Sequence, residues 1–132
     1  MKRAYVAGAM DGQPLFNAPL FLSAKQFLAS LDIDATTPVE LNEKEGWTQE
    51  ALLALSKEEY RKVRAYLLVT DLLFLHKCDY VFILPNSEGS EGTLLESMYM
   101  LQLGSEVYQL VAVDNKIVLA YNILTKEPYV SQ

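Results

Sequence analysis

Two acidic residues of the sequence lie within apolar runs, where a carboxylate needs a hydrogen-bonding partner or a chemical role. Glu96 stands in the segment SEGSEGTLLESMYM (87–100), and Asp71 stands in TDLL (70–73). A carboxyl group kept from water must be hydrogen-bonded, paired or directed into a cavity, because burying an unsatisfied polar group is costly. Two carboxyl groups from different helices can divide the work of a nucleophile and a proton donor. Glu96 and Asp71 are therefore the first candidates for chemistry.

The helix that contains Asp71 is predicted from its N-terminal cap and its periodicity. The capping box Ser56–Glu59 opens a helix that ends near Lys77. At 100° per residue, Asp71 falls within a stripe of mainly apolar and aromatic residues: Tyr60, Val63, Leu67, Phe74 and Cys78. The other flank of the helix is apolar as well. We therefore expect this helix to be buried against a second subunit, in a homodimer or a higher homo-oligomer.

Glu96 lies on a second predicted helix, 91–103, which ends at Gly104. The expected core stripe of this helix consists of four apolar residues: Leu94, Leu95, Met98 and Leu101. Glu96 falls on the other face, which is too apolar for open solvent, and the positive end of the helix favours its ionised form. An anionic carboxylate in such a place can act as a nucleophile. The periodicity alone leaves a plainer interpretation open, with Asp71 as a structural hydrogen-bonding residue and Glu96 at a rim.

The remaining segments alternate between strand and helix patterns. Apolar β-prone runs predict strands at 4–7, 34–40, 80–84, 106–113 and 116–121, with a tight turn at Asp114–Asn115. Further helices are predicted at 18–31, after the N-cap residue Asn17, and at 48–55, whereas 41–46 is expected to be a loop. The alternation predicts one α/β domain over residues 1–132, with three layers and a mostly parallel, Rossmann-like sheet.

Ligands of open α/β folds bind beyond the carboxyl ends of the parallel strands. Two glycine-containing loops qualify in this chain. AGAMDGQP (7–14) follows the first strand, and the loop 85–89 follows the strand 80–84. We expect the site at these two loops.

Composition narrows the possible partners. The net charge is −6 and no cluster of Lys and Arg is present, which argues against a nucleic-acid polymer as partner. No apolar run is long enough to span a membrane and the N-terminus lacks a signal pattern, so we expect a cytoplasmic protein. No metal site or cofactor is predicted: Cys78 is expected to be a buried thiol, His76 a solvated residue at a helix end, and AGAMDG is no dinucleotide fingerprint. Trp47 is either a lid over a ligand or a core anchor.

Four segments, in this order, carry a family resemblance: YVAGAM, TDLL, CDYVFILP and SEGTLLE. Together they resemble the nucleoside 2-deoxyribosyltransferase superfamily, over roughly residues 4–103. That superfamily includes 2′-deoxynucleoside 5′-monophosphate N-glycosidases and CMP hydrolases. The opening AGAMDGQPLFN is similar to small phage or bacterial members. The resemblance implies a deoxyribosyltransferase-like fold in a bacterial or phage-infected cytoplasm.

The resemblance also implies roles for individual residues. Glu96 matches the catalytic glutamate that attacks the anomeric carbon, Asp71 the acid that assists the departing base, and Tyr5 the tyrosine that hydrogen-bonds the nucleophile. The implied substrate-binding residues are Gly8, Met10 and Asp11 of the first loop, Ser90 and Gly92 at the helix start, and Asn122. In the monophosphate hydrolases the serine contacts the phosphate, and in the transferases the asparagine is donated across the subunit interface.

The implied activity is cleavage of the N-glycosidic bond of 2′-deoxynucleosides, with transfer of the sugar to another base or to water. Two alternatives are a 2′-deoxynucleoside 5′-monophosphate N-glycosidase and a non-catalytic nucleoside- or nucleotide-binding module. The first loop has Ala9 where proline is common and carries no Lys or Arg, which favours a neutral nucleoside. After Glu96 the sequence reads ESMYM instead of E-x-G-x-A, so Met98 and Met100 are expected to repack an interface or to narrow the site.

Overall fold

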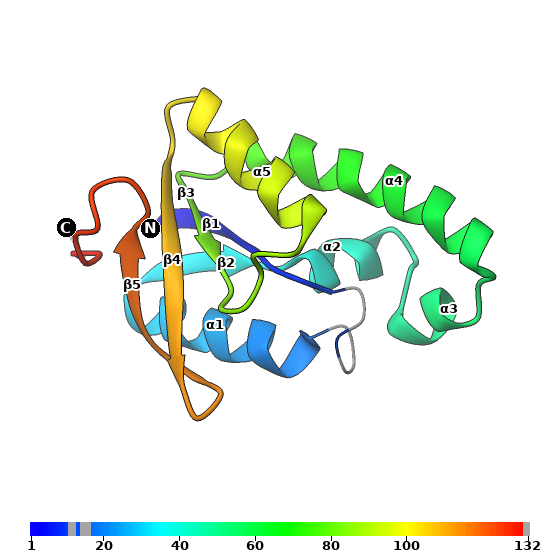
Figure 1. Ribbon diagram of the computed structural model, residues 1–132, viewed down its shortest axis with the longest axis horizontal. Helices are drawn as coiled ribbons and strands as arrows, with labels where there is room; N and C mark the ends of the chain where they lie inside the picture. Colours follow the sequence, from blue (N-terminus) through cyan, green and yellow to red (C-terminus); the bar gives the residue numbers. More distant parts are fainter. Residues whose placement is uncertain (11–12, 14–16, 131–132) are drawn as a thin grey trace.

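Five strands form one sheet in the order β2-β1-β3-β4-β5 in the computed structural model, which describes residues 1–10, 13 and 17–130 (Figure 1). The strands are β1 (Lys2–Ala7), β2 (Ile33–Thr36), β3 (Tyr80–Ile83), β4 (Glu106–Val113) and β5 (Lys116–Asn122). The first four run parallel, and β5 returns antiparallel to β4. The mostly parallel, Rossmann-like α/β architecture is therefore confirmed.

Helices cover both faces of this sheet. They are α1 (Ala18–Ser30), α2 (Pro38–Lys44), α3 (Gln49–Leu53), α4 (Lys57–Leu75) and α5 (Glu91–Gln102). Helix α1 packs against one face, whereas α2, α4 and α5 lie on the other (Figure 1). The short helix α3 lies beyond the sheet, next to the N-terminal end of α4. The layers are helix, sheet and helix, as the sequence predicts.

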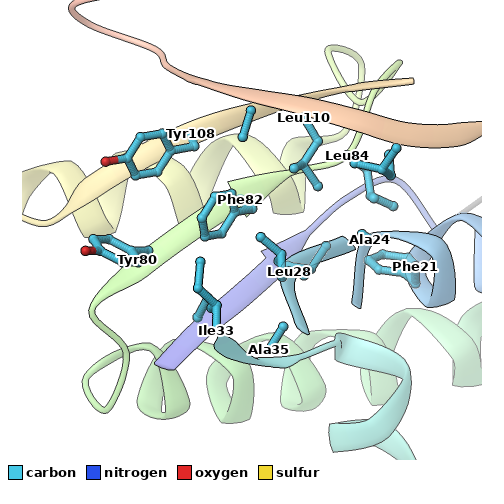
Figure 2. Close-up of a cluster of buried hydrophobic side chains, with 14 residues drawn as sticks. Phe21, Ala24, Leu28, Ile33, Ala35, Tyr80, Phe82, Leu84, Tyr108 and Leu110 are labelled. Atoms are coloured by element: carbon cyan, nitrogen blue, oxygen red, sulfur yellow. The ribbon is translucent and has the colours of Figure 1, made fainter. Parts of the chain in front are cut away.

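Alternate residues of the central strands build the two cores. On the α1 side, Tyr80, Phe82 and Tyr108 pack with Phe21 and Leu28 in a cluster of buried side chains (Figure 2). Phe82 and Tyr108 stack with ring centroids 5.1 Å apart. On the other face the inward residues are mostly apolar too, but Tyr5 adds a buried hydroxyl among them. The Tyr5 hydroxyl thus places a polar group on the face of the sheet that α4 and α5 cover.

Several local features agree with the sequence. The capping box at Ser56 is complete: its Oγ accepts from the Glu59 N–H at 3.1 Å, and the Glu59 carboxylate accepts from the Ser56 N–H at 3.0 Å. The turn at Asp114 and Asn115 has φ of 52° and 63°, as a tight hairpin turn requires. Asn17 does precede α1, but its side chain donates to the Ala9 carbonyl instead of capping the helix.

The predicted loop at 41–46 is wrong, because this segment belongs mostly to α2. Thr37 caps the helix by accepting from the Glu40 N–H, and Pro38 occupies the first turn, where its missing N–H costs nothing. The strand predicted at 34–40 ends at Thr36 for the same reason. Gly46 then takes a φ of 86° just beyond the helix. Short capping signals here outweigh the polar composition of LNEKEG.

The core stripe predicted for α5 is wrong at three of its four residues, whereas Leu101 does pack against the core. Leu94, Leu95 and Met98 are 59%, 46% and 55% exposed, and the buried residues are Thr93, Glu96, Ser97 and Met100. The polar members of the inward face satisfy one another locally. The Ser97 hydroxyl donates to the Thr93 carbonyl at 2.8 Å, and the Thr93 hydroxyl donates to Ser90 Oγ at 2.9 Å. Helix α5 is thus turned so that Glu96 faces inward and three large apolar side chains face outward.

Within the part of the chain that the structure describes, no helix has the length and hydropathy needed to cross a membrane.

Candidate active site

A cavity of about 530 Å³ opens at the carboxyl ends of β1 and β3. Its walls come from the loop after β1, from the loop after β3 together with the first two turns of α5, and from one face each of α2 and α4. Leu52 of α3 also lines it. This is the edge of the sheet at which the sequence predicts a site, and both predicted loops contribute to it.

Three predicted residues meet inside this cavity. Tyr5, Asp71 and Glu96 all line it, with only 0%, 7% and 5% of their surfaces exposed. The Tyr5 hydroxyl donates to Glu96 Oε2 at 2.8 Å, and Asp71 lies close enough to help raise the pKa of that hydroxyl. Strand β1, helix α4 and helix α5 each supply one member, so the sheet and both helices fix their mutual positions. Figure 1 shows α4 and α5 running together over that end of β1.

Both carboxyl groups have a raised pKa. Burial is the main cause of the raised pKa of Glu96, and the neighbouring Asp71 raises it further. Burial likewise raises the pKa of Asp71. Near neutral pH the pair therefore holds about one proton, and the hydrogen bond from Tyr5 stabilises the ionised form of Glu96.

One oxygen of this cluster has no partner within the described part of the chain. Asp71 Oδ1 is buried and makes no hydrogen bond there. An orphaned buried oxygen costs about 1–3 kcal/mol. Because Asp71 lines the cavity, a ligand with a matching polar atom can supply the missing hydrogen bond.

The start of α5 forms another wall. Ser90 is its N-cap residue, and its Oγ accepts from the Thr93 N–H at 3.2 Å. Ser90 and Gly92 both line the cavity. A Cβ on Gly92 would meet its nearest neighbour, Arg64 Nη2, at 3.8 Å, an ordinary contact distance. An alanine would therefore fit at this position. Because Gly92 has no side chain, the space stays open to a ligand in the cavity.

The first loop approaches the neighbouring strand closely. A Cβ on Gly8 would lie 2.6 Å from Cδ1 of the fully buried Leu84, so only glycine fits this position without displacing core atoms. Met10, partly buried, also lines the cavity. Asp11, the third predicted residue of this loop, lies outside the described residues.

Ser87 joins the two loops and is a residue that sequence reasoning missed. Its Oγ accepts from the Ala9 N–H at 3.0 Å, and its exposure is only 4%. The bond ties the loop after β1 to the loop after β3 at the cavity wall. A serine in a Pro-Asn-Ser loop carries no signal for such a cross-strand contact, because the contact depends on the pairing of β1 with β3.

Asn122 lies away from this cluster. It ends β5, and its Oδ1 accepts from the N–H groups of Leu124 and Thr125 at 2.9 and 3.1 Å. The side chain thus closes a turn and does not line the cavity of its own chain. Its implied role across a subunit interface stays a prediction.

Two further cavity residues also escaped the sequence reading. Arg64 lies seven residues before Asp71, which is 700° or 20° short of two full turns, so the helical wheel already places both on one face of α4. Asn42 is 5% exposed and comes from α2, the segment predicted as loop. The sequence could therefore have indicated Arg64 as a cavity residue, but not Asn42.

The other singled-out residues stay outside the cavity. Trp47 is partly buried and packs near Leu52 and Leu67, which fits the core-anchor alternative. His76 follows α4 and is hydrogen-bonded to the Tyr99 hydroxyl. Burial raises the pKa of Cys78 to about 11, which keeps it a thiol. No group of three or more metal-ligating side chains occurs in the described residues.

Comparison with known proteins gives one family. The family described as "Domain of unknown function (DUF4406)" matches residues 2–109. This span includes β1, β2 and β3, the first half of β4 and every residue of the cavity wall described above. No curated protein matches the chain.

Proposed function

We propose that this chain, which belongs to the DUF4406 family of domains of unknown function, cleaves the N-glycosidic bond of 2′-deoxynucleosides or of their 5′-monophosphates. The sugar passes through a covalent intermediate on Glu96 and is transferred to another base or to water. One observation carries the proposal: a buried glutamate held by a tyrosine faces the same cavity as a buried aspartate with an orphaned oxygen. A deoxyribosyltransferase-like version of the α/β fold is part of the proposal.

The first step uses both acids. A carboxylate oxygen of Glu96 attacks the anomeric carbon, and the bond between that carbon and the base nitrogen breaks. The electron pair of this bond stays on the base, which takes the proton of Asp71. Positive charge develops on the sugar beside Glu96 and negative charge on the base beside Asp71, so each acid stabilises the charge nearest to it.

The second step reverses these roles. A nitrogen of an acceptor base, or a water molecule, attacks the anomeric carbon and the bond to Glu96 breaks, which restores its carboxylate. The proton of the attacking group returns to Asp71. Tyr5 keeps its hydroxyl proton throughout and holds the Glu96 carboxylate in place through the 2.8 Å bond.

The cavity supports a ligand of this size. Its volume of about 530 Å³ falls within the roughly 300–1,000 Å³ usual for small-molecule sites. The bulky residues after Glu96 do not narrow it: Met98 is 55% exposed on the outer face, Met100 is fully buried in the core, and neither lines the cavity. The departure from E-x-G-x-A therefore leaves room for a nucleoside.

The direct test is incubation of the protein with 2′-deoxynucleosides and their 5′-monophosphates, with and without an acceptor base. We expect chromatography to detect free or exchanged base. Mass spectrometry of protein quenched during turnover should find a deoxyribosyl adduct on Glu96. Binding without any release of base would contradict catalysis and favour the alternative, a nucleotide-binding module.

The assembly belongs to the same proposal, with a second copy of this chain as partner. Large apolar side chains are exposed on the adjacent helices α4 and α5: Val69, Leu73, Leu94, Leu95 and Met98, each 46–65% exposed (Figure 1). Large apolar side chains exposed on neighbouring helices are typical of protein interfaces. A two-fold axis through it would pair like surfaces.

Light scattering should report a homodimer for the wild type and a monomer for the double variant Leu73→Glu, Leu95→Glu. Leu53→Glu is the matched control, because Leu53 is 71% exposed on α3, away from this surface. A wild-type protein that stays monomeric over a wide concentration range would refute the dimer.

A further inference from the structure

Arg64 brings a positive charge to a cavity whose other charged lining residues are the acids Asp71, Glu91 and Glu96. Among the described residues that line the cavity it is the one Lys, Arg or His, and it comes from α4, not from a loop. Its Nη2 lies 3.8 Å from the position that a Cβ of Gly92 would take. The guanidinium therefore lies beside the first turn of α5.

That first turn offers backbone donors at the same place. The Ser90 side chain occupies the Thr93 N–H, but no described residue accepts from the N–H groups of Glu91 and Gly92. Free N–H groups at a helix start, together with the helix dipole, favour an anion. Residues 90–93 all line the cavity, so these donors border the same space as Arg64.

The buried oxygen of Asp71 indicates where the other end of a ligand would lie. Asp71 Oδ1, buried and without a partner in the described chain, lies on the same face of α4, two turns beyond Arg64. Seven residues correspond to a rise of about 10 Å along the helix. A ligand that satisfies both ends needs a hydrogen-bonding ring at one end and an anionic group several ångströms away at the other.

We propose that the substrate is a 2′-deoxynucleoside 5′-monophosphate, with its base at Asp71 and its phosphate held by Arg64 and the start of α5. The inference rests on the proposed function and chooses between its two substrate classes. Arg64 has another interaction within the chain, and a guanidinium with five N–H donors can keep it and still donate to a phosphate. Glu91 also borders the site and opposes the anion, so the phosphate must lie on the Arg64 side of the helix start.

This assignment revises the expectation of a neutral nucleoside. That expectation depended on the lack of Lys and Arg in the first loop, where monophosphate hydrolases generally use such residues. In this chain the cation comes from helix α4 instead of the loop. The choice of substrate class then depends on Arg64, which the sequence motifs do not include.

Binding, measured without turnover, tests the proposal. We would use the Glu96→Gln protein, the four deoxynucleoside monophosphates, the matching nucleosides and inorganic phosphate, in titration calorimetry. The monophosphate should bind at least about tenfold more tightly than its nucleoside, since charge-assisted hydrogen bonds to phosphate are worth that much. Arg64→Gln should remove this preference and leave nucleoside affinity unchanged. Arg61→Gln, which removes an exposed charge from the same helix outside the cavity, should keep it.

The outcomes separate this inference from the proposed function. Equal affinity for nucleoside and monophosphate, or equal losses of both in Arg64→Gln, would overturn the phosphate site even if the wild type releases bases. An Arg64-dependent preference in a protein without any base release would uphold the phosphate site and overturn the catalytic proposal. Failure of every monophosphate to bind at millimolar concentration would overturn the phosphate site outright.

Discussion

Replacing Glu96 by glutamine is expected to lower the rate of base release by at least about 10³-fold and to stabilise the folded protein at the same time. The rate falls because an amide cannot form the glycosyl ester. The stability rises because the ionised carboxylate is buried beside a second acid, and both facts disfavour its charge. Glutamine has nearly the same shape, and its oxygen can still accept from the Tyr5 hydroxyl.

The two effects have different pH dependences, which makes the test sharp. At pH 8.5 the variant should unfold at a higher urea concentration than the wild type, whereas at pH 5 the two should coincide because Glu96 is then protonated. Base release should be lost at both pH values. Glu58→Gln is the control, since that side chain is 83% exposed on α4. An unchanged rate in Glu96→Gln would end the nucleophile assignment, and a lower stability at pH 8.5 would contradict the cost of its burial.

The sequence predicts the fold better than the orientation of its helices. Alternating strands and helices, the Ser56 capping box and the turn at Asp114 are local patterns, and each is confirmed. The inward face of α5 is not, because hydropathy cannot register that the Ser97 hydroxyl donates to the Thr93 carbonyl and the Thr93 hydroxyl to Ser90 Oγ. Three residues of the predicted core stripe are therefore exposed, and the face that carries Glu96 is the buried one.

The residues of the site show the same contrast: local sequence patterns indicate some of them, and others depend on tertiary contacts. Asp71 and Glu96 stand out in the sequence because their carboxyl groups lie within apolar runs, Tyr5 is implied only by the family resemblance, and the structure brings all three together. Ser87 and Asn42 do not stand out, because their positions depend on strand pairing and on a helix that composition hides. Arg64 shares a helical face with Asp71, so periodicity could have found it once the cavity was assigned to that face.

Stability should fall as the pH rises from about 5 to about 8, the reverse of ordinary acid denaturation. Burial raises the pKa of Asp71 from 3.8 to about 7, and burial with the charge of Asp71 raises that of Glu96 from 4.5 to about 8. In this range the unfolded chain releases protons that the folded protein keeps, so the slope of the unfolding free energy is negative. The stabilisation is fully present below about pH 4 for these two groups and is lost as the pH passes the folded pKa values. Each group contributes up to about 1.4 kcal/mol per pH unit between its unfolded and folded pKa, so we expect a total loss of several kcal/mol.

Urea unfolding at half-unit pH steps would measure this slope, and the double variant Asp71→Asn, Glu96→Gln should flatten it. The single variants should each remove part of the slope, and their effects should not add, because the charge of Asp71 raises the pKa of Glu96 and so couples the two titrations. Glu59 cannot account for a slope of this sign: its lowered pKa, caused by hydrogen bonds with Ser56, makes stability fall toward acid pH, and only below this window. A wild-type slope that survives in the double variant would place its origin outside the cavity. A flat wild-type curve would mean that burial does not raise the pKa of either acid.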